Sequence, residues 1–272
     1  MRTFRGTIAI SALVVGLGLI AMPVLSLETG SMTQVDPDSE GPDPNALFSE
    51  AFRAYARGDK AESLEIYRSA AELGHIGALW KIGRMYETGD GIDADRHKAY
   101  LAYREMARRH GDIPPNDRDS VYVSSAFVTL AGMLRDGVEG QVDADPFAAR
   151  RVYFYAASYF GEREAQYELG RMLQLGEQSP GNSRQAARWL KLASDKGHIG
   201  AMALLGQMLY AGDGIESQPV VGLAMLIRAR ELASGDDASW INELYEGVNG
   251  EADHKVRADA TALAAKLAQT ED

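Results

Sequence analysis

The amino-acid sequence predicts an all-α protein, built as a right-handed superhelical solenoid of stacked helix pairs. One observation is an internal repeat, since residues 74–92 (GHIGALWKIGRMYETGDGI) recur as residues 197–215 (GHIGAMALLGQMLYAGDGI). A second is the spacing of the glycines that close successive units, which is 36 to 38 residues with one enlarged interval of 50: Gly74, Gly111, Gly161, Gly197 and Gly235. A period of this length is typical of helix-turn-helix repeats, in which each unit buries its apolar face against the next.

The first 26 residues have the pattern of a secretory signal peptide. Arg2 and Arg5 precede an uncharged stretch over residues 8–27, and Pro23 and Ser26 supply a break and a small residue near a cleavage point. The alternative is an uncleaved membrane anchor, because about 20 uncharged residues can span a bilayer. Both interpretations place the remainder outside the cytoplasmic membrane, and we expect the mature chain in the periplasm.

Residues 27–43 are rich in acidic residues, glycine, proline and serine, and this composition predicts a flexible acidic linker. Asp43 and Pro44 then supply an N-cap and a first-turn proline, so we expect the folded part to begin at residue 44. The repeat spacing predicts five helix pairs over residues 44–235. Residues 236–272 are expected to form capping helices that cover the apolar face of the last repeat.

Residues 76–111 show how one unit folds. Apolar residues recur at helical spacing over residues 78–86, and Gly83 lies on this face, where a missing side chain lets the second helix approach. Residues 89–91 (Gly-Asp-Gly) tolerate left-handed backbone angles and end the first helix. Asp95 is expected to cap the second helix, and Asp145 before a proline plays the same part in the third unit.

Charge and composition exclude several classes of function. The net charge is −11 and the isoelectric point is about 5.0, with no long run of lysine or arginine, so a nucleic-acid partner is not expected. The absence of cysteine excludes disulfides, thiolate metal sites and a cysteine nucleophile. No motif for catalysis, a cofactor, a metal or a small-molecule substrate is found, so we expect binding to another protein and no enzymatic activity.

The third unit carries an unusual aromatic group in its second helix, RRVYFYAASYF over residues 150–160. The candidate partner-binding residues are Tyr153, Phe154, Tyr155, Tyr159 and Phe160. One interpretation is that they pack against an insertion over residues 112–119, and the other is that they form an exposed patch for a partner.

His75 and His198 occupy the same repeat position, directly after an inter-unit glycine. That repetition indicates a structural role in the turn, but both are also candidates for a response to pH. Histidine titrates near a pKa of about 6.5. Loss of residues 1–26 leaves 39 acidic against 26 basic residues, a net charge of −13, and charging five histidines would move it toward −8. Acid would then weaken attraction to a positively charged partner.

The repeated residues resemble the Sel1-like repeat family, which is related to tetratricopeptide repeats and has a pattern close to A-x-x-x-L-G-x-M-Y-x-x-G-x-G. Residues 78–91 and 201–214 follow this pattern closely. The third unit departs from it at Ala131, which replaces the motif glycine, and the fourth unit loses the second loop glycine.

Export signal, acidic linker, five repeats and absence of cysteine together resemble the periplasmic ExoR-type regulators. The resemblance implies a protein that binds the periplasmic region of a membrane sensor histidine kinase, restrains it, and so controls exopolysaccharide synthesis and related programmes. It also implies release under acid conditions and by proteolysis of the regulator. The alternative function is an envelope scaffold, anchored by an uncleaved helix over residues 8–27, that organises a cell-wall or polysaccharide assembly.

Overall fold

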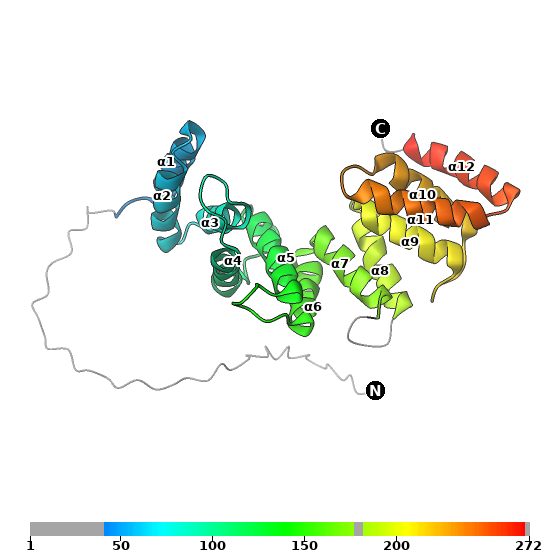
Figure 1. Ribbon diagram of the computed structural model, residues 1–272, viewed down its shortest axis with the longest axis horizontal. Helices are drawn as coiled ribbons and strands as arrows, with labels where there is room; N and C mark the ends of the chain where they lie inside the picture. The colour runs from blue at the N-terminus through cyan, green and yellow to red at the C-terminus, as the bar shows by residue number, and fades with distance from the viewer. Residues whose placement is uncertain (1–40, 177–181, 270–272) are drawn as a thin grey trace, which may run out of the picture. The chain divides into compact units, whose positions relative to one another are not determined.

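Twelve α-helices and one π-helical turn make up the ordered elements of the computed structural model, which describes residues 41–176 and 182–269 (Figure 1). The predicted signal peptide and most of the predicted linker lie outside the described residues. The helices are α1 (Pro44–Arg57), α2 (Lys60–Glu72), α3 (Ile76–Thr88), α4 (Arg96–His110), α5 (Ser120–Asp136), α6 (Pro146–Tyr155), α7 (Arg163–Gln174), α8 (Ser183–Ser194), α9 (Ile199–Ala211), α10 (Pro219–Leu232), α11 (Asp237–Glu251) and α12 (His254–Ala268), with the π-helical turn η1 (Ala156–Phe160) directly after α6.

Successive helices pack in pairs, each with its neighbour along the chain. The closest packing joins α1 with α2, α3 with α4, α5 with α6, α7 with α8 and α9 with α10, while α11 and α12 both pack on α10. Beyond the helices, the described residues show only an isolated antiparallel bridge between Val138 and Val142. The prediction of an all-α solenoid of helix pairs is confirmed.

Helix ends lie where the sequence predicts them. The side chains of Asp43, Asp95 and Asp145 accept hydrogen bonds from backbone N–H groups in the first turns of α1, α4 and α6. Gly58 ends α1 with φ of 92°, and Gly89 ends α3 with φ of 68°. Both angles lie in the left-handed region that glycine adopts without steric cost. Among the described helices, none combines the length and apolar character that crossing a membrane requires.

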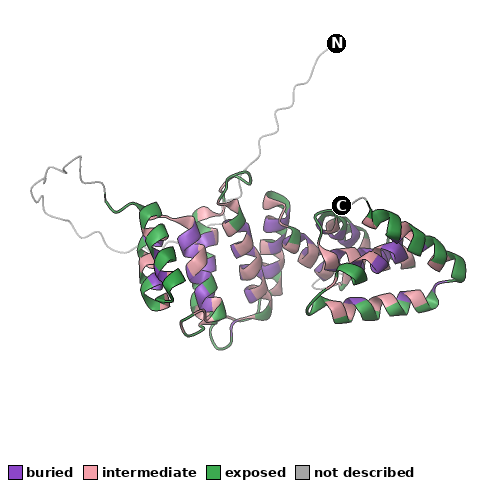
Figure 2. Cartoon of the chain, turned by 90° about the horizontal axis from the view of Figure 1, so that it is seen from above, coloured by how far each residue is buried: buried purple, intermediate pink, exposed green. Residues whose placement is uncertain are grey.

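The core lies along the faces that the helices turn toward one another (Figure 2). Motif methionines Met85, Met172 and Met208 are buried in it. The motif glycines mark the points where paired helices approach most closely. A Cβ at Gly83 would lie 2.6 Å from the ring of Tyr103, and one at Gly206 would lie 2.8 Å from the carbonyl oxygen of Gly222. No side chain fits at either position, and at Gly83 this is what the sequence predicted.

Candidate functional site

The aromatic segment of the third unit is not one continuous α-helix. After Tyr155 the backbone widens into the π-helical turn η1, which ends at Gly161 with φ of 65°. The Ser158 hydroxyl donates to the carbonyl oxygen of Phe154 at 2.6 Å, a local bond that competes with regular helix geometry. π-Turns often occur at functional sites. Here the turn contains Tyr159 and Phe160 of the aromatic group.

Part of the aromatic group packs against the start of the insertion. The Tyr155 hydroxyl donates to the carbonyl oxygen of Gly111 at 2.9 Å, and that of Tyr159 donates to the carbonyl oxygen of Asp112 at 3.1 Å. Phe127 of α5 lies 5.1 Å from the Tyr155 ring and 5.8 Å from the Phe160 ring, measured between centroids. These contacts fasten the turn to the end of α4 and to α5.

The remaining aromatic side chains divide between core and surface. Tyr153 is only 2% exposed, so the prediction that it belongs to a partner-binding surface is wrong, because α6 turns this side chain toward α5 and α7. Phe154 is 52% exposed and Tyr159 is 39% exposed. Sequence reasoning missed Phe147, which is 60% exposed and precedes Phe154 by two helical turns on the same face of α6. Spacing by seven residues was the signal that could have found it.

His75 is the N-cap of α3. Its Nδ1 accepts a hydrogen bond from the backbone N–H of Ala78 at 3.1 Å. Its ring stacks on Phe48 of α1, with 4.2 Å between centroids and an interplanar angle of 8°. A Cβ at Gly77 would lie within 3.5 Å of His75, Phe48 and Tyr122 of α5, so this glycine leaves room for all three rings. The first histidine cap therefore links α3 to α1, and Tyr122 of α5 lies beside the adjoining glycine.

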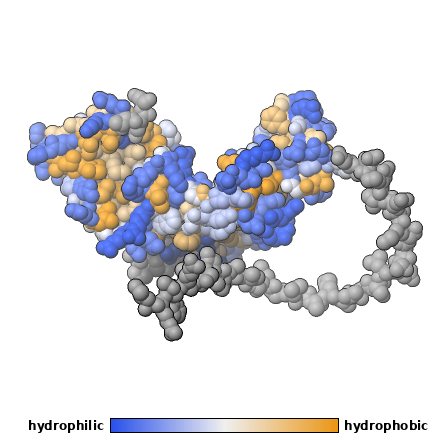
Figure 3. Space-filling model, turned by 180° about the vertical axis from the view of Figure 1, so that it is seen from behind, coloured by the Kyte–Doolittle hydropathy of each residue, from blue (hydrophilic) through white to orange (hydrophobic). Residues whose placement is uncertain are grey.

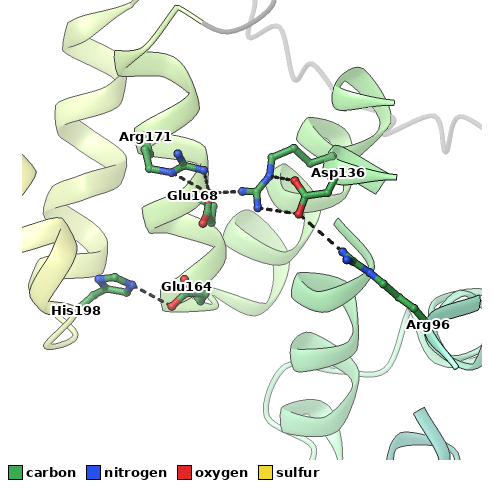
Figure 4. Close-up of polar contacts among 7 residues, drawn as sticks. Arg96, Asp136, Glu164, Glu168, Arg171 and His198 are labelled. Atoms are coloured by element: carbon green, nitrogen blue, oxygen red, sulfur yellow. Dashed lines mark hydrogen bonds and ion pairs between the residues drawn. The ribbon is translucent and has the colours of Figure 1, made fainter. Parts of the chain in front are cut away.

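The same arrangement recurs at His198, the N-cap of α9. Its Nδ1 accepts from the backbone N–H of Ala201 at 3.1 Å, and its ring stacks on Tyr167 of α7 with 4.1 Å between centroids. A Cβ at Gly200 would lie 3.2 Å from both His198 and Tyr167 and 3.3 Å from Trp240 of α11. In addition, Nε2 of His198 lies 2.9 Å from a carboxylate oxygen of Glu164 (Figure 4). The second histidine cap links α9 to α7, and Trp240 of α11 lies beside the adjoining glycine.

Both caps depend on an unprotonated Nδ1. A nitrogen that accepts a backbone hydrogen bond carries no proton, so the cap geometry requires an unprotonated Nδ1 in each ring. Protonation of Nδ1 would remove the cap and place a positive charge at the positive end of a helix dipole. Burial lowers the pKa of His75 from its usual value, although Asp119 and Asp43 act in the opposite direction and Arg118 adds to the lowering. The fold therefore favours the neutral form of His75.

A chain of ion pairs links the middle units (Figure 4). Arg135 of α5 lies 2.8 Å from Asp136 and 2.9 Å from Glu168 of α7, which also pairs with Arg171 at 2.8 Å. Arg96 of α4 extends the chain through Asp136 at 3.8 Å. The hydrogen bond from Arg135 holds the pKa of Asp136 below its usual value. Glu168 is only 15% exposed. Its ion pair with Arg135 connects α5 of the third repeat with α7 of the fourth.

Nothing in the described part of the chain resembles a metal centre, since no group of three or more histidine, aspartate and glutamate side chains is placed to hold an ion. The polar and aromatic features described above are instead spread over the surfaces and junctions of successive units. Extended surfaces of this kind are what solenoid proteins use for binding.

Comparison with known proteins identifies the repeats. The model of the Sel1 repeat matches residues 53–75, 76–109, 163–198 and 199–234. An exopolysaccharide production negative regulator of Rhizobium leguminosarum bv. viciae is 36% identical over 230 residues, which cover 84% of this chain and 84% of the relative. The chain belongs to the Sel1-repeat family of ExoR-type proteins. A protein of Rhizobium meliloti (strain 1021) with the same name is 39% identical over 204 residues, or 75% of this chain and 74% of the relative.

A solved structure supports the fold of this ExoR-type chain. The Sel1 repeat protein from Oxalobacter formigenes superposes with a TM-score of 0.59 at 20% identity, covering 86% of this chain and 91% of the other. The segment that the Sel1 repeat model leaves unmatched between its second and third matches, residues 110–162, contains the insertion, α5, α6 and the aromatic turn. In this ExoR-type protein the unusual aromatic features therefore coincide with the unit that departs most from the repeat.

Proposed function

We propose that this chain is an exported regulator that binds the periplasmic region of a membrane sensor histidine kinase and restrains it, thereby limiting exopolysaccharide production. The observation that carries the proposal is the likeness, at 36% and 39% identity over most of the chain, to two regulators named for negative control of exopolysaccharide production. A solenoid of helix pairs supports it, because such folds act through extended binding surfaces. Catalysis has no part in this proposal.

The contact surface that we propose is the exposed face of α6 with the adjoining turn, which we call the α6 face: Phe147, Phe154 and Tyr159. Large aromatic side chains contribute much of the binding energy in protein interfaces. Phe154 is supported from one side by Trp189 of α8, whose ring lies 6.0 Å away edge to face. Tyr159 is held by its hydrogen bond to Asp112. A patch fixed in this way loses little conformational entropy when a partner binds.

An acid response is part of the same proposal. Protonation of the His75 cap would remove the hydrogen bond from Ala78 and loosen the junction of α3 with its neighbours. Loosened junctions expose backbone to proteases, and the accompanying gain of positive charge weakens attraction to an electropositive partner. We therefore expect both partner release and proteolytic sensitivity to increase between pH 7 and pH 5.5.

The test is binding of the mature protein to the isolated periplasmic region of the sensor kinase from the same cell, measured by calorimetry at both pH values. Phe154→Ala should weaken binding about thirtyfold, which corresponds to about 2 kcal/mol. Phe52→Ala is the matched control, because Phe52 is similarly exposed, at 57%, but lies on α1. Equal affinity of the parent and both variants would remove the α6 face from the proposal, and absence of any binding would refute the kinase as partner.

Export has a separate test. N-terminal sequencing of the protein recovered from cells should give a start near Leu27, as a cleaved signal peptide requires. An intact Met1 would instead favour the membrane-anchored envelope scaffold. The described residues do not include this segment, so the two functions are distinguished by this measurement alone.

A further inference from the structure

A second surface, remote in sequence from the α6 face, lies among α8, α9 and α10. It is a groove of about 740 Å³, within the size range of ligand-binding clefts. Six of its apolar lining residues come from α9, α10 and the loop between them: Met202, Leu205, Leu209, Ile215, Val221 and Met225. Figure 3 shows apolar residues gathered over this C-terminal part of the described chain. Two methionines suit such a surface to partners of varied shape.

The internal repeat shows why the groove is open. Residues 60–105 align with residues 183–228 without a gap, so each position has a counterpart in the first two units. There, Tyr86 of α3 is buried between α2 and α4, where its hydroxyl receives a hydrogen bond from Arg68 and Lys98 lies 5.2 Å from its ring centroid. The counterpart of Tyr86 is Leu209, which is smaller. Leucine in place of the motif tyrosine leaves the space between α8 and α10 unfilled.

The charges around the groove differ in the same comparison. Along α2 the counterparts of the α8 rim are Ala61, Glu65 and Arg68, which together carry no net charge. Along α8 these positions are Arg184, Arg188 and Lys191, with a net charge of +3, and all three line the groove. On the opposite wall Arg228 of α10 replaces Glu105.

Two of these cations are already held by acidic neighbours. Lys191 lies 2.8 Å from Asp195, and Arg228 lies 2.5 Å from Glu231. Arg184 and Arg188 are exposed and one helical turn apart, so they present two guanidinium groups along one edge of the groove. In a chain whose net charge is −11, this concentration of basic side chains beside an apolar floor is a local reversal of the surface charge.

We propose that this basic groove binds an acidic, amphipathic peptide segment from a partner protein. Apolar side chains of the segment would cover the groove floor, and its carboxylates would pair with Arg184 and Arg188. Charge complementarity selects the segment, and burial of apolar area supplies its affinity. The floor is preorganised because α9 and α10 touch through their backbones, where Gly206 faces Gly222. Kinase binding at the α6 face does not require this site, so the inference goes beyond the proposed function.

The experiment uses the full mature chain and two fluorescein-labelled helical peptides of about 18 residues. Both peptides carry leucines on one face. The opposite face carries glutamates in the first peptide and lysines in the second. The glutamate peptide should bind with a dissociation constant of about 10 μM or below, measured by fluorescence anisotropy, and the lysine peptide should bind at least about tenfold more weakly. Arg184→Glu with Arg188→Glu should weaken binding of the glutamate peptide about tenfold or more. The control variant, Arg53→Glu with Arg57→Glu on α1, makes the same change in net charge. It should bind the glutamate peptide as tightly as the parent does.

Leu209→Tyr provides an independent variant, because it restores the residue that fills the equivalent space beside α3. It should keep the thermal stability of the parent and weaken glutamate-peptide binding about tenfold. If this variant does not fold, the arginine pair alone decides the question. Kinase binding measured on the same variants should not change, which separates failure here from failure of the proposed function.

Five results would overturn the inference. Equal binding of the two peptides, or no binding of the glutamate peptide, would exclude selection by charge. Unchanged affinity in the arginine pair variant would remove the groove as the site. A dimer in sedimentation velocity that the arginine variant dissociates would make a second copy of this chain the occupant. Adsorption to phosphatidylglycerol vesicles that the same variant abolishes would assign the groove to an anionic membrane surface.

Discussion

Replacement of His75 by asparagine should make the stability of the protein less sensitive to acid. Asparagine is a good N-cap and can accept the hydrogen bond from the Ala78 N–H, but it does not titrate. The parent loses this acceptor when Nδ1 is protonated. The His75→Asn variant therefore separates the cap from the charge, and the cost at neutral pH is confined to the lost stacking on Phe48.

The sign of the effect follows from the pKa. Because burial lowers the pKa of His75 in the folded state, the unfolded chain binds more protons as the pH falls below the usual value of 6.5. Stability contributed by the neutral cap is complete above that value and is lost as the pH falls toward the folded-state pKa. Loss of an N-cap costs about 1 kcal/mol, and a positive charge at a helix N-terminus adds about 0.3–1 kcal/mol. Proton linkage limits the free energy of unfolding that one histidine can remove between pH 6.5 and pH 5 to about 2 kcal/mol.

The assay is urea unfolding at pH 7 and pH 5, followed by far-ultraviolet circular dichroism. We expect the parent to lose about 1 kcal/mol more than His75→Asn over this interval. His254→Asn is the control, because His254 is exposed and Asp253, not His254, caps α12. The reasoning is refuted if His75→Asn and the parent respond equally to pH, or if the control variant reduces the response as much as His75→Asn does.

Three further predictions test the packing and the electrostatics. Gly222→Ala should lower the free energy of unfolding, measured in urea, by about 1–3 kcal/mol, because the new Cβ would lie 2.5 Å from the carbonyl oxygen of Gly206. Gly132→Ala is the control and should be neutral or stabilising, because the nearest contact of its Cβ would be at 3.5 Å. Equal effects of the two substitutions would refute the close crossing of α9 and α10. Arg135→Met should lower the free energy of unfolding by about 1 kcal/mol at pH 7. Because Arg135 lowers the pKa of Asp136, the difference in unfolding free energy between parent and variant should shrink as the pH falls below 3.8. A difference that stays constant with pH would contradict this. Phe160→Ala should reduce the melting temperature more than Phe154→Ala, because Phe160 packs on Phe127 whereas Phe154 is half exposed. The reverse order in a thermal scan would contradict the placement of the π-helical turn.

Much of the local structure could be predicted from single residues. Helix starts at Asp43, Asp95 and Asp145, and the close helix approach at Gly83 and Gly206, depend on short-range sterics and hydrogen bonds that a few neighbouring residues determine. The repeat then fixed the fold class, because units that cannot bury an apolar face alone must stack.

The π-turn could not be predicted in this way. Its residues are ordinary helix formers by pattern, and the turn depends on where Phe127 and the carbonyl oxygens of Gly111 and Asp112 lie in space. The inward position of Tyr153 does not depend on the π-turn, because Tyr153 lies in the regular part of α6. Its spacing from Ala149 and Ala156, which are also buried, was a helical pattern that could have predicted it.

The sequence by itself determined that His75 and His198 share a repeat position, that the chain is an acidic helical solenoid, and that Leu209 replaces a motif tyrosine. Only the tertiary structure decided what these residues do. Each histidine stacks on an aromatic ring from another helix, and the space left beside Leu209 is walled by α8 and α10. Propensity and capping act between neighbours in the chain, whereas stacking and cavities depend on side chains that only packing brings together.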